Sequence, residues 1–280
     1  MTTIAITGAT GHLGRLAIAA LKSRAPAANI IALVRNTAAD VGVPTRAFDY
    51  KNLDTSVLAG VDVLVLISSS DFDDRIGQHK NVIDAAKSAG VGRIVYTSIL
   101  SGAANPMILA QDHIATEAAI VASKIPATIL RNGWYTENYT GSLGGSVAAG
   151  AMIGASGKGR ISSAARADYA DAIAVVALDK SHVGLTYELA GDTAHTMDEF
   201  AAEVSRLLGK TIPYNDLPAA AYEEILQSFG LPEGVAFVFA DSDIQAKSGA
   251  LFNDSKTLSK LIGRPTTPIA GPIKAALDAL

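Results

Sequence analysis

The sequence predicts a doubly wound α/β fold, a Rossmann-type parallel sheet with helices on both faces, and a smaller C-terminal lobe. Short apolar segments rich in Val, Ile and Leu alternate with longer segments of helical periodicity, and a glycine-rich turn joins the first of each. Near-continuous apolar strands are typical of a parallel sheet that is buried on both faces. Ligands bind such sheets at the carboxyl ends of the strands, so we expect the chemistry in the loops that follow them.

The first half of the chain alternates strands with helices. Apolar residues recur at helical spacing in residues 12–24, directly after a short apolar strand at residues 3–7. The further strands that we expect are residues 29–34, 61–67, 92–97 and 127–131. The further helices that we expect are residues 53–58, 76–89 and 109–124.

The second half is less regular. Residues 141–159 contain seven glycines and predict a loop region that is mobile or closely packed. Thr196 and Glu199 have the spacing of a capping box, which predicts that a helix begins there and continues to residue 208. The other expected elements are helices at 167–178, 218–228, 255–262 and from about 268, and a strand at 185–189. We expect a nucleotide-binding domain over residues 1–150 and a smaller α/β substrate lobe over 151–280, partly interleaved with the sheet.

The composition excludes several classes of protein. With 280 residues, 49% of them hydrophobic, the chain can bury a large core. It contains no cysteine, which rules out disulfides, thiolate metal sites and a cysteine nucleophile. Its net charge of −4 gives no general footprint for nucleic acid or an anionic membrane. No apolar run is long enough to span a bilayer, and the first residues have no basic region, so we expect no signal peptide and a cytoplasmic location. No His, Asp or Glu cluster has metal-ligand spacing, and we expect no metal.

The strongest motif is the turn GATGHLG at residues 8–14, which follows a strand and opens a helix. In this context the glycines allow a tight turn, a close approach of the backbone to a pyrophosphate, and close packing of helix on strand. The helix N-terminus offers free N–H groups and a positive dipole to the same anion. The turn residues that we expect to contact a dinucleotide are Gly8, Ala9, Thr10, Gly11, His12 and Leu13.

Two further strand ends carry candidate ligands. Arg35 lies 21 residues after Gly14, where an acidic residue would bind a ribose 2′-hydroxyl and an arginine suits a 2′-phosphate. This position favours NADP(H) over NAD(H); the alternative is an exposed surface arginine. The hydroxyl and N–H groups of Ser68, Ser69 and Ser70 could contact the ribose or phosphates. The alternative is a polar loop in which Ser70 or Asp71 caps the next helix.

Longer stretches resemble a known family. The segments IAITGATGHLG at 4–14, LISSS at 66–70, LRNGWYTENY at 130–139 and DSKTLSKLIG at 254–263 are similar to NAD(P)H:quinone oxidoreductases of the NmrA-like, atypical short-chain dehydrogenase/reductase family. The similarity extends over nearly the whole chain. It implies a quinone or other small aromatic acceptor as partner. It also implies that one loop contacts the cofactor, through Asn132, Gly133, Trp134, Tyr135, Thr136 and Glu137.

The catalytic pattern of the wider superfamily is incomplete. Mainstream members use a Ser and a Tyr-x-x-x-Lys, in which the lysine lowers the pKa of the phenol that protonates the carbonyl. Here Ser98 is in place, but the matching helix has His113 and Glu117. A carboxylate at that position would raise the pKa of His113. His113 is therefore a candidate proton donor, and the alternative is a His–Glu pair on the helix surface.

Two functions remain open at this stage. A quinone accepts hydride without strong acid catalysis, so the protein would mainly hold nicotinamide and acceptor in contact, with Trp134 and Tyr135 stacking on the acceptor. Trp134, the single tryptophan, could instead belong to the core. The alternative to an enzyme is a catalytically silent protein that senses NADP(H) for a partner. The sequence does not determine the oligomeric state and leaves a homodimer open.

Overall fold

A computed structural model describes residues 2–71 and 74–280, and they form two compact units. The first unit contains the described residues up to Gly102 together with Asp112–Asn132 and Arg166–Tyr187. The second contains Ala103–Gln111, Gly133–Ala165 and Glu188–Leu280. The chain thus enters the second unit three times, and the expected division after residue 150 stays a prediction.

The first unit is built on a seven-stranded sheet in the order β3-β2-β1-β4-β5-β6-β8. Its strands are β1 (Thr3–Ile6), β2 (Asn29–Val34), β3 (Thr45–Ala47), β4 (Val63–Leu66), β5 (Arg93–Ile99), β6 (Ala127–Asn132) and β8 (Thr186–Leu189). The pairs from β3 to β6 are all parallel. The order reverses at β1, so the carboxyl ends of β2, β1 and β4 lie next to one another. This arrangement confirms the predicted doubly wound sheet.

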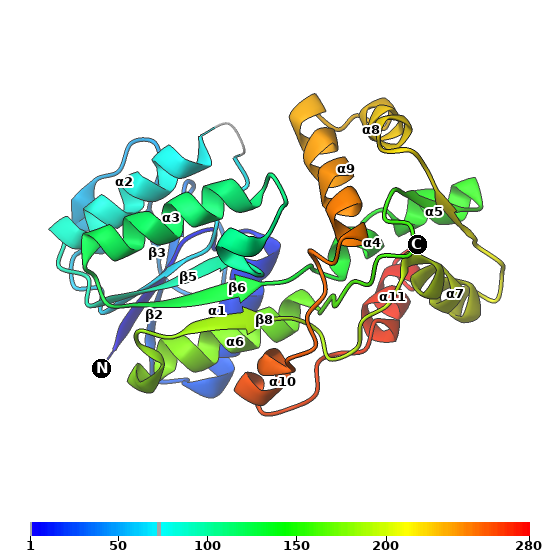
Figure 1. The fold of residues 1–280 in the computed structure, drawn as a ribbon. Coiled ribbons are helices and arrows are strands. Elements are labelled where there is room, and N and C mark those ends of the chain that lie inside the picture. The colour runs from blue at the N-terminus through cyan, green and yellow to red at the C-terminus, as the bar shows by residue number, and fades with distance from the viewer. Residues whose placement is uncertain (1, 72–73) are drawn as a thin grey trace. The chain divides into compact units, whose positions relative to one another are not determined.

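Helices cover both faces of this sheet (Figure 1). They are α1 (His12–Arg24) and α6 (Arg166–Leu178) on one face, and α2 (Arg75–Ser88) and α3 (Ala110–Ser123) on the other. Beneath α2 and α3, Leu64 and Ile94 of the sheet pack with Val82, Ile83 and Ile120 of the helices. Short 3₁₀ helices lie at Thr55–Leu58, Gly102–Ala104 and Lys180–His182.

The second unit is mostly helical. Its helices are α4 (Glu137–Thr140), α5 (Leu143–Ala149), α7 (Met197–Leu208), α8 (Ala219–Ser228), α9 (Glu233–Lys247), α10 (Thr257–Ile262) and α11 (Ala270–Leu277). The strands β7 (Met152–Gly154) and β9 (Tyr214–Asp216) form a two-stranded parallel sheet. The predicted capping box is confirmed, since Thr196 accepts the N–H of Glu199 and the Glu199 carboxylate accepts the N–H of Thr196.

The structure differs from the sequence prediction mainly in the second unit. The interpretation of residues 141–159 as a loop region is wrong, because α5 and β7 lie within it. Close packing is found there, however: a Cβ on Gly154 would lie 2.7 Å from Asp243 Oδ2. Helix α9 was not predicted, because its apolar residues do not gather on one face and its hydrophobic pattern is weak. None of the helices in the two described stretches has both the length and the apolar character needed to cross a bilayer.

Candidate functional site

The glycine turn after β1 has the geometry that the motif predicts. Gly8 has a φ of +60°, a conformation that suits glycine, and its carbonyl accepts the N–H of Gly11 at 2.9 Å. A Cβ on Gly14 would overlap the Gly8 carbonyl oxygen and lie 2.8 Å from the Cα of Ala9. Gly14 therefore allows α1 to pack directly on the turn.

The first turn of α1 is suited to an anion. Its N-cap is Gly11, which has no side chain to bond the first N–H groups, and the turn contains no acidic residue. Thr10, Gly11 and His12 are exposed, whereas Ala9 and Leu13 are buried and fix the turn against the core. Unbonded N–H groups and the helix dipole at such an end favour a phosphate. The turn therefore fits the diphosphate of a dinucleotide.

The end of β4 contacts the glycine turn. Ile67 donates its N–H to Thr7 Oγ1 at 2.9 Å, and a Cβ on Gly8 would lie 3.5 Å from the Ile67 side chain. Ser68 follows directly. On the other side of β1, Arg35 follows β2 and is exposed. Within residues 2–71 and 74–280, Arg35 takes part in none of the ion pairs.

The turn formed by residues 68–70, here called the serine turn, is held by the first turns of α2. The Ser69 N–H donates to His79 Nε2 at 3.0 Å, its carbonyl accepts from Arg75 Nε at 2.7 Å, and its hydroxyl donates to Gln78 Oε1 at 2.7 Å. Ser68 donates its N–H to Thr97 Oγ1. Ser70 does not cap α2, whose N-cap residue is Asp74. The turn is thus anchored through its middle residue, and exposed Ser70 is accessible to a ligand.

The serine of the superfamily pattern is engaged elsewhere. Ser98 Oγ donates to Glu117 Oε1 at 2.6 Å, and Glu117 also binds Arg131, with Arg131 Nη2 2.7 Å from Glu117 Oε2. Glu117 therefore occupies the place of the missing lysine with the opposite charge. A Ser98 hydroxyl that is committed to a carboxylate does not support the alcohol–ketone mechanism.

His113 lies in the interior of the first unit. Its Nδ1 is 2.8 Å from the Tyr96 hydroxyl, and both residues are buried. Burial, assisted by the nearby charge of Arg75, lowers the pKa of His113 well below its usual value, and burial raises that of Tyr96. The expectation that Glu117 raises the pKa of His113 is wrong because burial lowers that pKa. The alternative of a His–Glu pair on the helix surface is also wrong, because His113 is buried and Glu117 binds Arg131. Proton donation by His113 is untested by these contacts and would have to start from the neutral imidazole.

The predicted loop 132–137 begins at the end of β6 and continues in the second unit. Asn132 is buried, and Gly133 donates its N–H to the carbonyl of Leu189. Thr136 is buried and its hydroxyl lies 3.0 Å from Ser163 Oγ. Tyr135 and Glu137 are half-buried. Contact of this loop with a cofactor stays a prediction.

Trp134 is only 8% exposed and packs edge-to-face against Phe239, with ring centroids 6.4 Å apart. It belongs to the core of the second unit. Only this small exposed fraction of the residue is available to an acceptor.

Sequence reasoning missed the α2 residues that hold the serine turn. Arg75, Gln78 and His79 are buried although they are polar. They share the face of α2 that continues, four residues later, with the core residues Val82 and Ile83. Polar residues that extend an apolar helical stripe toward a strand end were the available signal.

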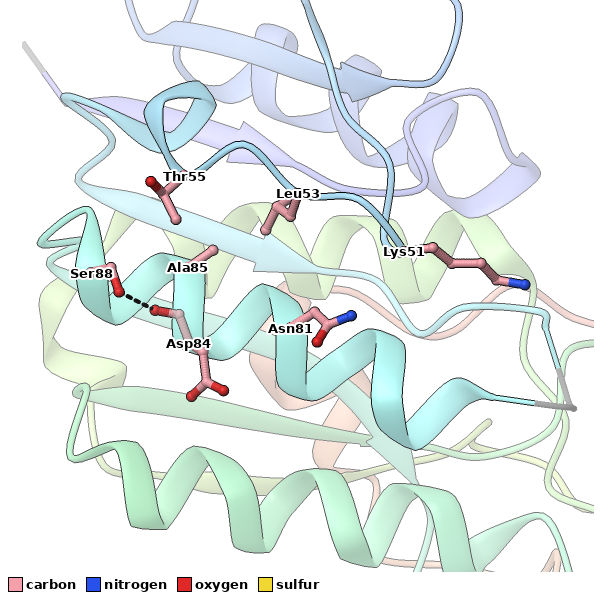
Figure 2. A pocket seen from close by; sticks show the side chains of 7 residues that line it. All are labelled: Lys51, Leu53, Thr55, Asn81, Asp84, Ala85 and Ser88. Carbon is pink, nitrogen blue, oxygen red and sulfur yellow. Dashed lines mark hydrogen bonds between the residues drawn. The ribbon is translucent and has the colours of Figure 1, made fainter.

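A shallow pocket also lies along α2, but none of the predicted site residues lines it (Figure 2). Its lining residues are Lys51, Leu53, Thr55, Asn81, Asp84, Ala85 and Ser88. Lys51 is paired with Asp71, and Asn81 donates to the carbonyl of Tyr50. In the part of the chain that the structure describes, no group of three or more His, Asp or Glu residues could hold a metal ion.

Comparison with known proteins gives a consistent picture. The model of the NmrA-like family matches residues 1–244. The chain is 50% identical to quinone oxidoreductase 2 of Escherichia coli K12 over 274 residues, which cover 95% of this chain and 96% of that protein. The crystal structure of an NADPH-dependent quinone oxidoreductase from Escherichia coli, complexed with NADPH, superposes with a TM-score of 0.93 at 49% identity and covers 98% of this chain and 99% of that one. The triphenylmethane reductase of Citrobacter sp., complexed with NADP(H), reaches a TM-score of 0.91 at 36% identity, covering 98% and 99% of the two chains.

Proposed function

The chain belongs to the NmrA-like family, and from this premise we propose that it is an NADPH-dependent oxidoreductase that reduces a quinone or a similar conjugated acceptor. The observation that carries the proposal is the 50% identity, over almost the full length of both chains, to a protein named quinone oxidoreductase 2. The anion-binding geometry of the glycine turn supports it independently.

The first unit supplies the contacts to NADPH in this proposal. The N–H groups at the start of α1 bind the diphosphate, since Gly8 and Gly14 bring the backbone close and no acidic residue lies in the first turn. Arg35 binds the 2′-phosphate through charge-assisted hydrogen bonds, which is the basis for NADPH over NADH. The serine turn borders the same group of strand ends and orients the cofactor.

When bound, NADPH supplies a hydride from C4 of its nicotinamide. The acceptor gains this hydride and one proton, so that a quinone becomes a hydroquinone and the cofactor leaves as NADP⁺. The protein's work is then to hold the two rings in contact and to exclude competing reactions. Because Ser98 is bonded to Glu117 and His113 is buried against Tyr96, we propose that the proton comes from solvent.

The test is NADPH oxidation with a benzoquinone and a naphthoquinone, followed by the loss of NADPH absorbance. We expect turnover that depends on both substrates and slows when the transferred hydrogen of C4 is deuterium. Arg35→Ala serves as a matched control, since it weakens NADPH binding without touching the glycine turn. Tight NADPH binding with no turnover on any acceptor would favour the silent sensor instead.

Four finer points belong to the same proposal. We propose a cytoplasmic location and a small aromatic acceptor as the physiological partner. Tyr135 and Trp134 are the proposed acceptor contacts. A homodimer stays a prediction, which sedimentation of the purified protein can test.

A further inference from the structure

His79 is a buried histidine whose two ring nitrogens are both hydrogen-bonded. Nε2 lies 3.0 Å from the backbone nitrogen of Ser69, and Nδ1 lies 2.8 Å from Thr116 Oγ1. Ser69 belongs to the serine turn after β4, and Thr116 lies on α3. The ring thus joins the loop at one strand end to a helix of the layer that covers the sheet.

These contacts determine the tautomer of His79. A backbone N–H can only donate, so Nε2 must be the unprotonated acceptor and Nδ1 must carry the proton. The Nδ1 proton then goes to Thr116 Oγ1, whose own hydroxyl donates to the carbonyl of Asp112 at 2.8 Å. The chain of donors runs in one direction from Ser69 to Asp112. A protonated His79 could not accept the Ser69 N–H.

The surroundings keep the ring neutral. Burial, with the charge of Arg75 as a second cause, lowers the pKa of His79 to about 3. Arg75 is itself paired with Asp112, 3.4 Å from Arg75 Nη1 to Asp112 Oδ2, and donates to the Ser69 carbonyl. The two polar atoms of the Ser69 backbone are therefore held from α2, the N–H by His79 and the carbonyl by Arg75.

We propose that His79 is a positioning residue for NADPH: by accepting the Ser69 N–H, it holds the serine turn in the orientation that binds the cofactor. The inference rests on the proposed function and extends it to a residue that lies away from the strand ends. Loss of the acceptor leaves the Ser69 N–H unpaired and removes one of the contacts that hold the turn, while those from Arg75, Gln78 and Thr97 remain. The turn is then less ordered, and the cofactor must order it on binding.

Three substitutions separate positioning from general stability. His79→Gln can place an amide oxygen near the site of Nε2, whereas the shorter side chain of His79→Asn reaches only the site of Nδ1, on the side of Thr116. His79→Leu removes both contacts and keeps an apolar volume. His182→Ala is the control, since the His182 ring pairs with the Tyr187 hydroxyl and is not among the partners of Ser69.

The first measurement needs no cofactor. The ¹⁵N spectrum of the imidazoles should show His79 protonated at Nδ1 only, over the neutral range of pH. The Ser69 amide should exchange slowly with solvent in wild type and His79→Gln, and faster in His79→Asn and His79→Leu. Protonation of His79 at Nε2 would overturn the inference.

The second measurement is NADPH binding by calorimetry, together with the quinone assay. We expect Kd and KM for NADPH to rise about tenfold in His79→Asn and His79→Leu, with His79→Gln close to wild type and kcat at saturating NADPH little changed. Equal losses of NADPH affinity in His79→Gln and His79→Leu, or a fall in kcat that follows the fall in Tm, would mean that His79 has a merely structural role. Either result would overturn this inference and leave the proposed function standing. A wild-type protein that binds no NADPH would overturn the proposed function, and this inference with it.

Discussion

Replacing Asp243 with Asn should stabilise the protein at neutral pH. Asp243 lies on α9 in the second unit, is 6% exposed, and accepts the N–H of Ala155 at 2.8 Å. The pKa of Asp243 is raised to about 6, mainly because the carboxyl is buried. The hydrogen bond from the Ala155 N–H and the charge of Lys247 lower this pKa, whereas the charge of Asp216 raises it. The ionised carboxylate is therefore an unfavourable group in the folded protein above that pH.

The sign of the pH dependence follows from the raised pKa. The folded state binds a proton to Asp243 more tightly than the unfolded state, so this contribution to stability is complete below about pH 4 and is lost as the pH rises through about 6. A difference of about two pKa units corresponds to at most about 3 kcal/mol. Asn is neutral at every pH, and its side-chain oxygen can still accept the Ala155 N–H. Because its NH₂ group also needs a partner, we expect a net gain of about 1–3 kcal/mol at pH 7 and none near pH 4.

Urea unfolding at both pH values tests this expectation. Trp134 is the single tryptophan and is buried in the second unit, so its fluorescence reports on the unit that contains Asp243. The quantity to compare is the free energy of unfolding of the variant minus that of wild type, because other titrations then cancel. Exposed Asp278 provides the control Asp278→Asn, for which little change is expected. A variant-minus-wild-type difference that is the same at both pH values would refute the reasoning.

Three further predictions concern the candidate site. Arg35→Ala should weaken the binding free energy of NADPH by about 1.5–3 kcal/mol and leave that of NADH nearly unchanged. An equal loss of affinity for both cofactors in calorimetry would contradict the 2′-phosphate role. Gly14→Ala should lower the free energy of unfolding by about 1–3 kcal/mol and weaken the binding of NADPH and NADH alike, because a Cβ overlaps the Gly8 carbonyl. An unchanged free energy of unfolding in chemical denaturation, with unchanged binding of both cofactors, would count against the close packing. His113→Phe should leave kcat for quinone within a few-fold but destabilise the fold by about 1–3 kcal/mol, because the buried Tyr96 hydroxyl loses its partner; a hundredfold lower kcat would make His113 the acid.

Much of the first unit could be predicted from the sequence because its signals are local. The helix at 12–24 and the strand at 29–34 were predicted with the bounds that the structure has. The glycine turn was recognised because residue type, spacing and the flanking strand and helix together specify a backbone conformation, which Gly8 adopts. In the second unit, α9 lacks an amphipathic pattern and could not be found in this way.

The sequence by itself determined the parallel sheet, the anion-binding turn and the basic residue after the second strand, since each depends on neighbours along the chain. Only the tertiary structure decided which polar groups pair. Glu117 lies four residues from His113 on the same helix, yet it binds Arg131 of a neighbouring strand, and His113 meets Tyr96. His79 and Ser69 likewise meet only through the packing of α2 on the sheet. The physical reason is that burial removes water as an alternative partner, so each polar group must bond whatever the fold brings within reach, regardless of sequence spacing.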